Sequence, residues 1–160
     1  LTLFPYTTLF RSLIKVIATG CGSGYFPFAS GTAGTIAAIP LYLALSSLSG
    51  PLYLLTAVAF TFLAIYAARE AEVIFGQQDS PRIVVDEWVG FLWTMLFIPP
   101  TLPHVVGGLV LFRFFDIVKL FPANVFQDRL PGGYGVVMDD VAAGVYANIG
   151  LHLLIRGGII

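Results

Sequence analysis

No Asp, Glu, Lys or Arg occurs between residues 16 and 68, and this uncharged stretch constrains the fold more than any other feature. A second uncharged stretch covers residues 88–112. Across the chain 58% of residues are hydrophobic and 11% are charged, whereas about 25% are charged in an ordinary soluble domain. The pattern therefore predicts an integral membrane protein.

Four apolar segments account for most of the chain, and each is expected to be helical. They are residues 36–48, 51–68, 88–112 and 141–155. Pro40 can kink the first segment. Three prolines within residues 99–103 favour a helical hairpin in the third segment over a single kinked crossing. We therefore predict an all-α fold, a compact membrane-embedded helical bundle with short, partly kinked helices.

The N-terminal residues, the single cysteine and the net charge further limit the possible folds and partners. Residues 1–12 show neither a helical nor a strand period, so they are predicted to be a non-native or fragment leader, and one domain is placed at residues 13–160. Cys21 is the one cysteine, which excludes an intrachain disulfide. The net charge of −1 gives no electrostatic reason to expect nucleic acid as a partner.

Charged residues are confined to the segments between the apolar ones. If residues 36–68 and 88–112 each form a hairpin, all nine acidic residues lie on one side of the membrane. With Arg11 in the leader set aside, every Lys and Arg except Arg156 lies on that side too. Because loops rich in Lys and Arg stay in the cytoplasm, the charged side is predicted to be cytoplasmic.

The stretch between the third and fourth apolar segments contains a cluster of charged residues that are candidates for a functional site. Arg113, Asp116 and Lys119 are spaced i, i+3, i+6, which places them along one face of a helix. A glycine-rich turn follows, and then the acidic pair Asp139 and Asp140. Carboxylates beside basic groups and a flexible glycine loop suit a metal ion and a phosphate. A solvated loop between two apolar helices fits the composition equally well.

A second acidic pair, Asp86 and Glu87, opens the third apolar segment. Adjacent helical residues point about 100° apart, so the two carboxylates cannot face one ligand equally. One of them can bind a metal ion while the other caps the helix or pairs with a cation. The alternative is the ordinary start of a surface helix, where acidic residues are favoured.

Small residues from Gly31 to Thr35 directly precede the first apolar segment. Their backbone N–H groups are expected at a helix N-terminus, where such groups can bind an anion. The segment lacks the Gly-Lys-Ser/Thr element of a Walker sequence. Close packing of helices through small residues explains the segment equally well.

Four motifs occur in order between residues 20 and 148. They are GSG with FP and SGTAGT (residues 22–24, 26–27 and 30–35), VDEWVG (85–90), FRFFDIVK (112–119), and GGYGVVMDD with AG (132–140 and 143–144). This ordered set resembles the phosphatidylglycerophosphatase A family of bacteria. Two positions depart from the family pattern, because Ser30 and Leu120 stand where the family usually has proline. Neither departure removes a charged group.

The resemblance implies a function and a location. It implies a Mg²⁺-dependent phosphatase that hydrolyses phosphatidylglycerophosphate to phosphatidylglycerol and phosphate in phospholipid biosynthesis. It places the protein in the bacterial inner membrane, with the lipid bilayer as its partner and the active site on the cytoplasmic face. Water and an aspartyl carboxylate both remain open as the nucleophile.

Roles for individual residues follow from this activity. Hard carboxylate oxygens suit Mg²⁺, whereas basic side chains and backbone N–H groups suit a phosphate. The predicted catalytic carboxylates are Asp86, Glu87, Asp116, Asp139 and Asp140. Asp86, Asp116 and Asp139 are predicted as the metal ligands. The predicted phosphate-binding residues are Gly31, Thr32, Gly34, Thr35, Arg113 and Lys119.

The main alternative is a non-catalytic membrane protein or small transporter with a cytoplasmic acidic ion site. An ion path through the membrane would require charged residues inside the apolar helices. Here the charges are predicted to lie between the helices, which favours a surface catalytic site.

Overall fold

The computed structural model describes residues 4–160, without the side chains of residues 4–6, 127 and 128. Residues 1–3 of the predicted leader lie outside the described part. The described chain contains no strand, which confirms the prediction of an all-α fold. Its helices are α1 (Phe4–Ala18), α2 (Ser30–Leu45), α3 (Gly50–Phe75), α4 (Val85–Thr94), α5 (Leu102–Val118), α6 (Ala123–Arg129) and α7 (Gly133–Arg156), with a 3-10 turn η1 (Ser23–Tyr25).

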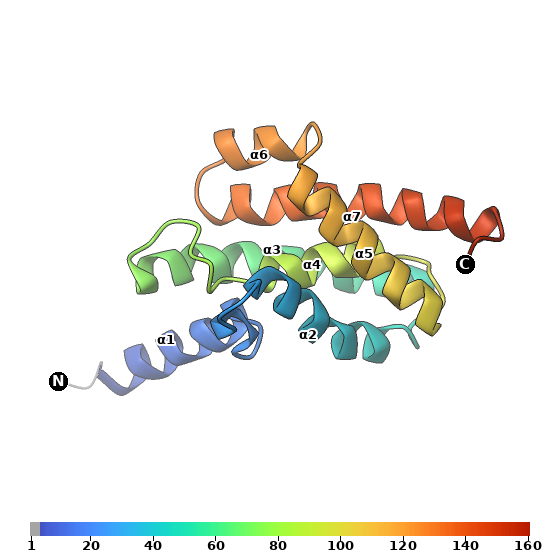
Figure 1. Ribbon diagram of the computed structural model, residues 1–160. Helices are drawn as coiled ribbons and strands as arrows, with labels where there is room; N and C mark the ends of the chain where they lie inside the picture. Colours follow the sequence, from blue (N-terminus) through green and yellow to red (C-terminus); the bar gives the residue numbers. More distant parts are fainter. Residues whose placement is uncertain (1–3) are drawn as a thin grey trace.

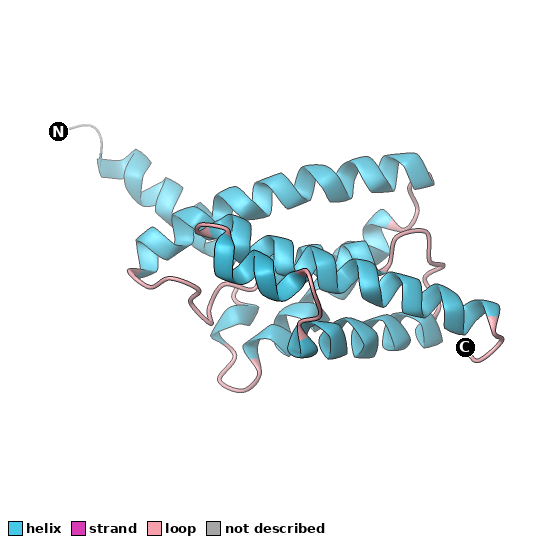
Figure 2. Cartoon of the chain, turned by 90° about the horizontal axis from the view of Figure 1, so that it is seen from above, coloured by secondary structure: helices cyan, strands magenta, loops and turns pink. Residues whose placement is uncertain are grey.

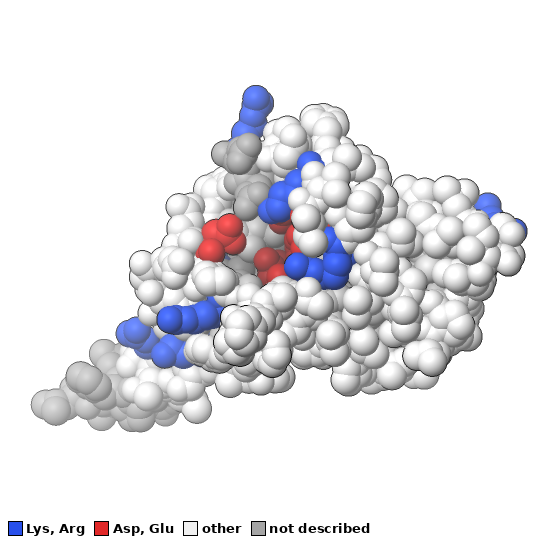
Figure 3. Space-filling model, in the orientation of Figure 1, with Lys and Arg blue, Asp and Glu red and all other residues white. Residues whose placement is uncertain are grey.

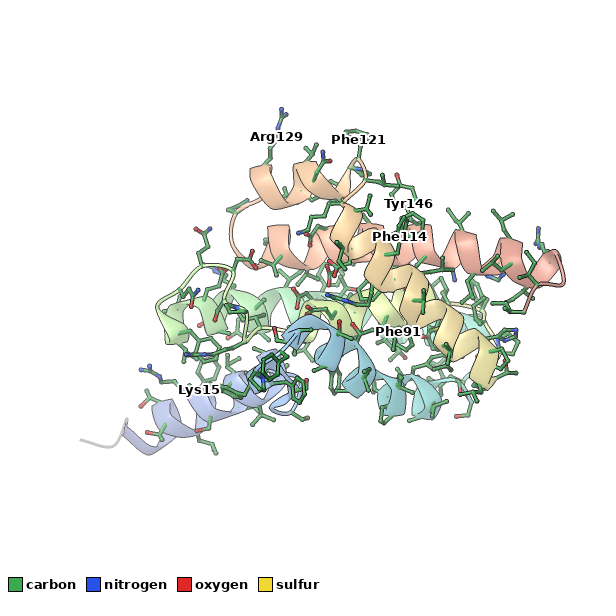
Figure 4. The ribbon with its side chains drawn as sticks, viewed as in Figure 1. Lys15, Phe91, Phe114, Phe121, Arg129 and Tyr146 are labelled. Carbon is green, nitrogen blue, oxygen red and sulfur yellow. The ribbon has the colours of Figure 1, made fainter. Side chains whose placement is uncertain are left out.

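The short helix α4 lies at the centre of the bundle (Figures 1 and 2). It packs against α2, α3, α5 and α7. Most of its side chains are buried, and Phe91 meets the ring of Tyr42 edge-on at 6.0 Å between centroids (Figure 4). Because α4 is surrounded by other helices, its first turn is held in a fixed position inside the bundle.

Two helices are longer than expected from the prediction of short helices. α3 has 26 residues and α7 has 24. Of the helices described, α3 alone is long and apolar enough to cross a membrane. Its Leu55, Phe62 and Val73 side chains are 64%, 66% and 76% exposed. Exposed apolar side chains of this size fit contact with lipid.

The predicted hairpin in the third apolar segment is confirmed. α4 ends at Thr94, the chain turns through the prolines, and α5 begins at Leu102 with Thr101 as its N-cap. The hairpin returns the end of α5 to the start of α4, so Arg113 lies 3.8 Å from Glu87. A single crossing would have separated these two residues by the length of the segment.

Three local predictions are tested. α2 begins at Ser30, so the N–H groups of Gly31 and Thr32 lie at a helix N-terminus as predicted, whereas Gly34 and Thr35 lie farther into the helix. The other two predictions are corrected. Lys119 follows the last residue of α5 in a left-handed conformation with φ 47°, so it does not continue the helical face of Arg113 and Asp116. Asp139 and Asp140 lie inside α7, so these charges are not between the helices. α7 can begin early because Gly133 packs directly against the α3 backbone, where a Cβ atom would overlap the Ile65 carbonyl oxygen.

Candidate active site

The close approach of α4 and α7 brings two predicted acidic segments together. Gly90 on α4 and Gly144 on α7 face each other, and a Cβ atom on Gly144 would overlap the Gly90 carbonyl oxygen. A Cβ atom on Gly90 would lie 2.9 Å from the Asp140 carbonyl oxygen. Because both residues lack a side chain, the two backbones can meet. The first turn of α4 therefore lies beside the acidic pair of α7.

Three carboxylates converge at this point. Each of Asp86, Glu87 and Asp140 offers an oxygen atom that lies within 4.8 Å of the others. Asp86 and Asp140 are 8% and 4% exposed. We call these residues the carboxylate trio. Asp86 and Glu87 can both take part because helical Cα–Cβ bonds tilt toward the helix N-terminus, and the trio lies at the N-terminal end of α4.

The trio has carboxylate oxygens that no described residue satisfies. Oδ1 of Asp86, Oε2 of Glu87 and Oδ2 of Asp140 are buried without a hydrogen-bond partner in the part of the chain that the structure describes. The trio lies outside α3, the candidate membrane span. Burial raises the pKa of Asp86 well above its usual value, and the charges of Glu87 and Asp140 raise it further. Burial also raises the pKa of Asp140 and of Glu87.

The chemistry of this donor set fits a divalent cation. Buried like charges repel one another, and unpaired buried oxygens are costly. A hard cation such as Mg²⁺ accepts carboxylate oxygens as ligands and would offset both effects. The residues of the trio therefore fit the ion that the sequence predicted, although only Asp86 belongs to the predicted ligand set.

The two other acidic residues of that set are paired with basic side chains. Arg113 donates from Nη1 to Oδ2 of Asp116 at 2.5 Å, and the same nitrogen lies 3.8 Å from Oε1 of Glu87. Lys119 donates from Nζ to Oδ2 of Asp139 at 2.8 Å. These pairs place both predicted phosphate-binding cations at the edge of the trio.

Asp139 and Lys119 have unequal surroundings. Burial raises the pKa of Asp139 to about 6, although its contact with Lys119 lowers it. Burial alone would lower the pKa of Lys119. The hydrogen bond to Asp139 and the negative charge of Asp139 outweigh this effect and raise the pKa of Lys119 overall. The Asp139 side chain is 6% exposed and that of Lys119 is 33% exposed. Loss of hydration therefore dominates at the aspartate, whereas the ion pair dominates at the lysine.

A pocket of about 140 Å³ opens above these residues. Figure 3 shows acidic and basic side chains gathered in one hollow of this face, with largely uncharged surface around it. The pocket walls include all five predicted carboxylates and Lys119. A volume of this size holds a small ion with an anionic group, and the surrounding charges match that combination.

The small-residue segment at the start of α2 divides into two parts. Ser30 lines the pocket, and a Cβ atom on Gly31 would overlap Glu87 Oε1 and approach Arg113. Gly34 instead packs against Val84, and the buried Thr35 hydroxyl donates to the Gly31 carbonyl. The structure therefore brings Gly31 to the candidate site, whereas Gly34 and Thr35 pack within the bundle.

Three polar residues of the pocket lining were not among the predicted site residues: Ser30, Asp79 and Ser80. Ser80 is 1% exposed, and its hydroxyl has no partner among the described residues. Asp79 and Ser80 lie in the loop between α3 and α4, where Asp79 has a left-handed φ of 48°. A polar loop directly before an acidic helix start is the sequence signal that points to them.

The all-helical fold of the described residues and a pocket lined by the carboxylate trio and Lys119 define a class of helical protein with a candidate site for a cation and an anionic group. Comparison with known sequences is more specific, because residues 16–155 match the phosphatidylglycerophosphatase A family. The chain belongs to this family of phosphatases and is therefore an enzyme, as the motif order predicted.

Three relatives illustrate the match. The chain is 38% identical to the phosphatidylglycerophosphatase A of Haemophilus influenzae, covering 85% of each protein. It is 34% identical to the phosphatidylglycerophosphatase A of Escherichia coli, covering 81% of this chain and 76% of the relative. It is 43% identical to a Bacteroides thetaiotaomicron protein named "Putative phosphatidylinositol-3-phosphatase", covering 84% and 88%. No solved structure matches the chain.

Proposed function

We propose that this protein is a Mg²⁺-dependent phosphatidylglycerophosphatase that releases the terminal phosphate of phosphatidylglycerophosphate and leaves phosphatidylglycerol. One observation carries the proposal: the carboxylate trio, which has oxygens without a hydrogen-bond partner among the described residues, lines one pocket with Lys119, and Arg113 lies 3.8 Å from Glu87 of the trio. The family match and the relatives from Haemophilus influenzae and Escherichia coli support the substrate.

In this proposal Asp86, Glu87 and Asp140 hold the metal ion. When bound, Mg²⁺ supplies positive charge that stabilises the phosphoryl group in the transition state. Asp116 and Asp139 orient the two basic side chains through the pairs described above. This assignment differs from the sequence prediction, which placed Asp116 and Asp139 among the first-choice ligands and kept Glu87 and Asp140 as further ligands or as residues that support them.

Arg113 and Lys119 bind the phosphate in this proposal. A phosphomonoester carries up to two negative charges, and a guanidinium with an ammonium group offsets them. Nε of Arg113 is buried and has no hydrogen-bond partner among the described residues, which supports its role as a donor to a phosphate oxygen. The N–H groups of Gly31 and Thr32 lie in the first turn of α2, where helical N–H groups can bind an anion.

Asp139 is the carboxyl group best suited to exchange a proton near neutral pH. Its pKa of about 6 lies closer to the working range than that of an ordinary aspartate. It can take a proton from the attacking water or give one to the departing glycerol oxygen. If an aspartate attacks instead, the reaction passes through an acyl-phosphate, and trapping a phosphoenzyme distinguishes the two routes.

The location that we propose is the bacterial inner membrane, with the pocket on the cytoplasmic face. The uncharged stretches of the sequence, the span α3 and its exposed apolar side chains support membrane insertion. The charged side of the molecule carries nearly all Lys and Arg residues, which favours the cytoplasm.

The test is phosphate release from a panel of lipid phosphates in mixed micelles, with Mg²⁺ and with EDTA. We expect Mg²⁺-dependent release that is fastest from phosphatidylglycerophosphate, and loss of release in the Asp86→Asn variant. Absence of release from every lipid would contradict the proposal.

A second candidate substrate comes from the relative in Bacteroides thetaiotaomicron, whose name refers to phosphatidylinositol 3-phosphate. The same pocket chemistry accepts any accessible phosphomonoester on a lipid headgroup. The panel therefore includes phosphatidylinositol 3-phosphate, and faster release from this lipid would reassign the substrate while leaving the phosphatase class intact.

A further inference from the structure

A second cavity lies on the other side of the α2 N-terminus from the active-site pocket. It is an apolar groove of about 420 Å³. Phe26 and Phe28 from the loop before α2 form one wall, and Ala33, Ile36 and Ala37 on α2 form the other. We call this cavity the α2 groove.

The α2 groove exposes large apolar side chains. Phe26, Phe28 and Ile36 are 56%, 77% and 53% exposed. Contiguous apolar surface of this kind marks a binding site or a membrane contact. The small side chains of Ala33 and Ala37, one helical turn apart, leave the floor of the groove open.

The first turn of α2 separates the groove from the active-site pocket. Ser30 lines the pocket and Gly31 lies against Glu87 and Arg113, whereas Ala29 and Thr32 line the groove. A polar, charged pocket and an apolar groove are therefore separated by a single helical turn, at the end of α2 that packs against α4 (Figure 1).

We propose that the α2 groove binds an acyl chain of the lipid substrate while the phosphate occupies the active-site pocket. This inference rests on the proposed function. A lipid phosphate has a charged group attached through a short polar linker to apolar chains, and the paired cavities match these two parts. Binding energy gained in the groove would hold the headgroup over the carboxylate trio.

The test varies the acyl chain and the groove together. Phosphate release is measured with the intact protein and a series of substrates that share one headgroup. Their acyl chains increase in length, from short and water-soluble to long. In the original protein we expect kcat/KM to rise with chain length, by at most roughly fourfold per methylene buried. Ala33→Trp and Ala37→Trp fill the groove. In these variants kcat/KM for the substrate with the longest acyl chain should fall roughly tenfold or more, while kcat/KM for the shortest substrate is unchanged.

Val110→Trp is the matched control, because Val110 is exposed on α5 and does not line the groove. It should retain the chain-length dependence. If both groove variants also retain it, the acyl chain lies elsewhere and the inference is overturned. If the original protein releases phosphate from no lipid, the proposed function itself fails, so the two failures are distinguishable.

A binding measurement covers the case in which the tryptophan variants disturb folding. A lipid phosphate with a photoreactive group at the end of its acyl chain is crosslinked to the original protein, and the labelled peptides are identified. Labelling within residues 26–37 that excess unlabelled lipid phosphate competes away supports the inference. Labelling spread over exposed apolar helices such as α3 would show only general contact with the bilayer, and would overturn it.

Discussion

Asp140 and Asp116 provide the sharpest test of the metal site at the scale of single residues. Asp140 belongs to the carboxylate trio, whereas Asp116 pairs with Arg113. Asp140→Asn should weaken Mg²⁺ affinity by at least about 100-fold, more than the 10–100-fold typical of a change outside the ligand set. The measurements are the Mg²⁺ dependence of phosphate release and the stabilisation by Mg²⁺ against thermal unfolding.

Asp116→Asn is the matched comparison. It should reduce activity by weakening the position of Arg113, and it should weaken Mg²⁺ binding by less than about 100-fold because Asp116 lies outside the trio. If Asp116→Asn weakens Mg²⁺ binding as strongly as Asp140→Asn, the ligand set predicted from the sequence is favoured over the trio.

Ser80 has a buried hydroxyl without a partner among the described residues, and it faces the pocket. Ser80→Ala removes an unsatisfied group, so the free energy of unfolding should be unchanged or higher by up to about 1 kcal/mol. If the hydroxyl donates to the bound phosphate, kcat/KM should fall roughly tenfold, which corresponds to one hydrogen bond. Ser47→Ala, at an exposed serine just beyond the C-terminal end of α2, is the control. Unchanged kcat/KM in Ser80→Ala would remove Ser80 from the site.

Stability of the metal-free protein should depend on pH through Asp139. Its pKa rises from 3.8 to about 6 on folding, so the folded state binds more protons than the unfolded state between these values. Stability in EDTA should therefore fall as pH rises from 3.8 to about 6, by at most about 3 kcal/mol from this residue. Thermal unfolding in detergent measures the fall, and Mg²⁺ should reduce it. Stability that rises across this range would contradict the assignment.

At the scale of helices, the contact between α4 and α7 positions the trio. Gly144→Ala places a methyl group against the Gly90 carbonyl oxygen, so the two helices must move apart. We expect a loss of about 1–3 kcal/mol in the free energy of unfolding together with weaker Mg²⁺ binding. Thermal unfolding with and without Mg²⁺ measures both effects.

Gly150→Ala, farther along the same helix, is the control. A Cβ atom there meets nothing closer than 3.5 Å. Because alanine favours a helix interior, this variant should be stabilised by up to about 1 kcal/mol. Equal effects of the two substitutions would show that the α4–α7 contact has no special role.

At the scale of the whole molecule, the charged segments lie at one end of the bundle. Arg129 at the end of α6 points away from the body of the protein on this side (Figure 4), and Arg156 ends α7 at the far end. In a Cys21→Ser background, cysteines at Gln78 and Arg129 should be labelled from the cytoplasmic side by an impermeant reagent, and a cysteine at Arg156 from the opposite side. Labelling of Gln78 and Arg129 from opposite sides would rule out the hairpin topology.

Much of this architecture follows from the sequence alone. The uncharged stretches predicted apolar helices because burying unpaired charge is prohibitive. The prolines of residues 99–103 predicted the turn between α4 and α5, because proline lacks a backbone N–H group and disfavours a helical conformation at the preceding residue. That turn brings the end of α5, with Arg113 and Asp116, back to Asp86 and Glu87 at the start of α4. The ordered motifs identified the family.

The grouping of the acidic residues was decided only by the tertiary structure. Five carboxylates were predicted at one site, but their partners depend on helix rotation and on backbone contacts between residues distant in sequence. Gly90 and Gly144 set the approach of α4 and α7, which places Asp140 with Asp86 and Glu87, while the left-handed turn at Lys119 places its ammonium group on Asp139. Sequence spacing describes neighbours along one helix, whereas the pocket is lined by residues of several helices. The sequence could therefore indicate which acidic residues gather, but not which three of them form the trio.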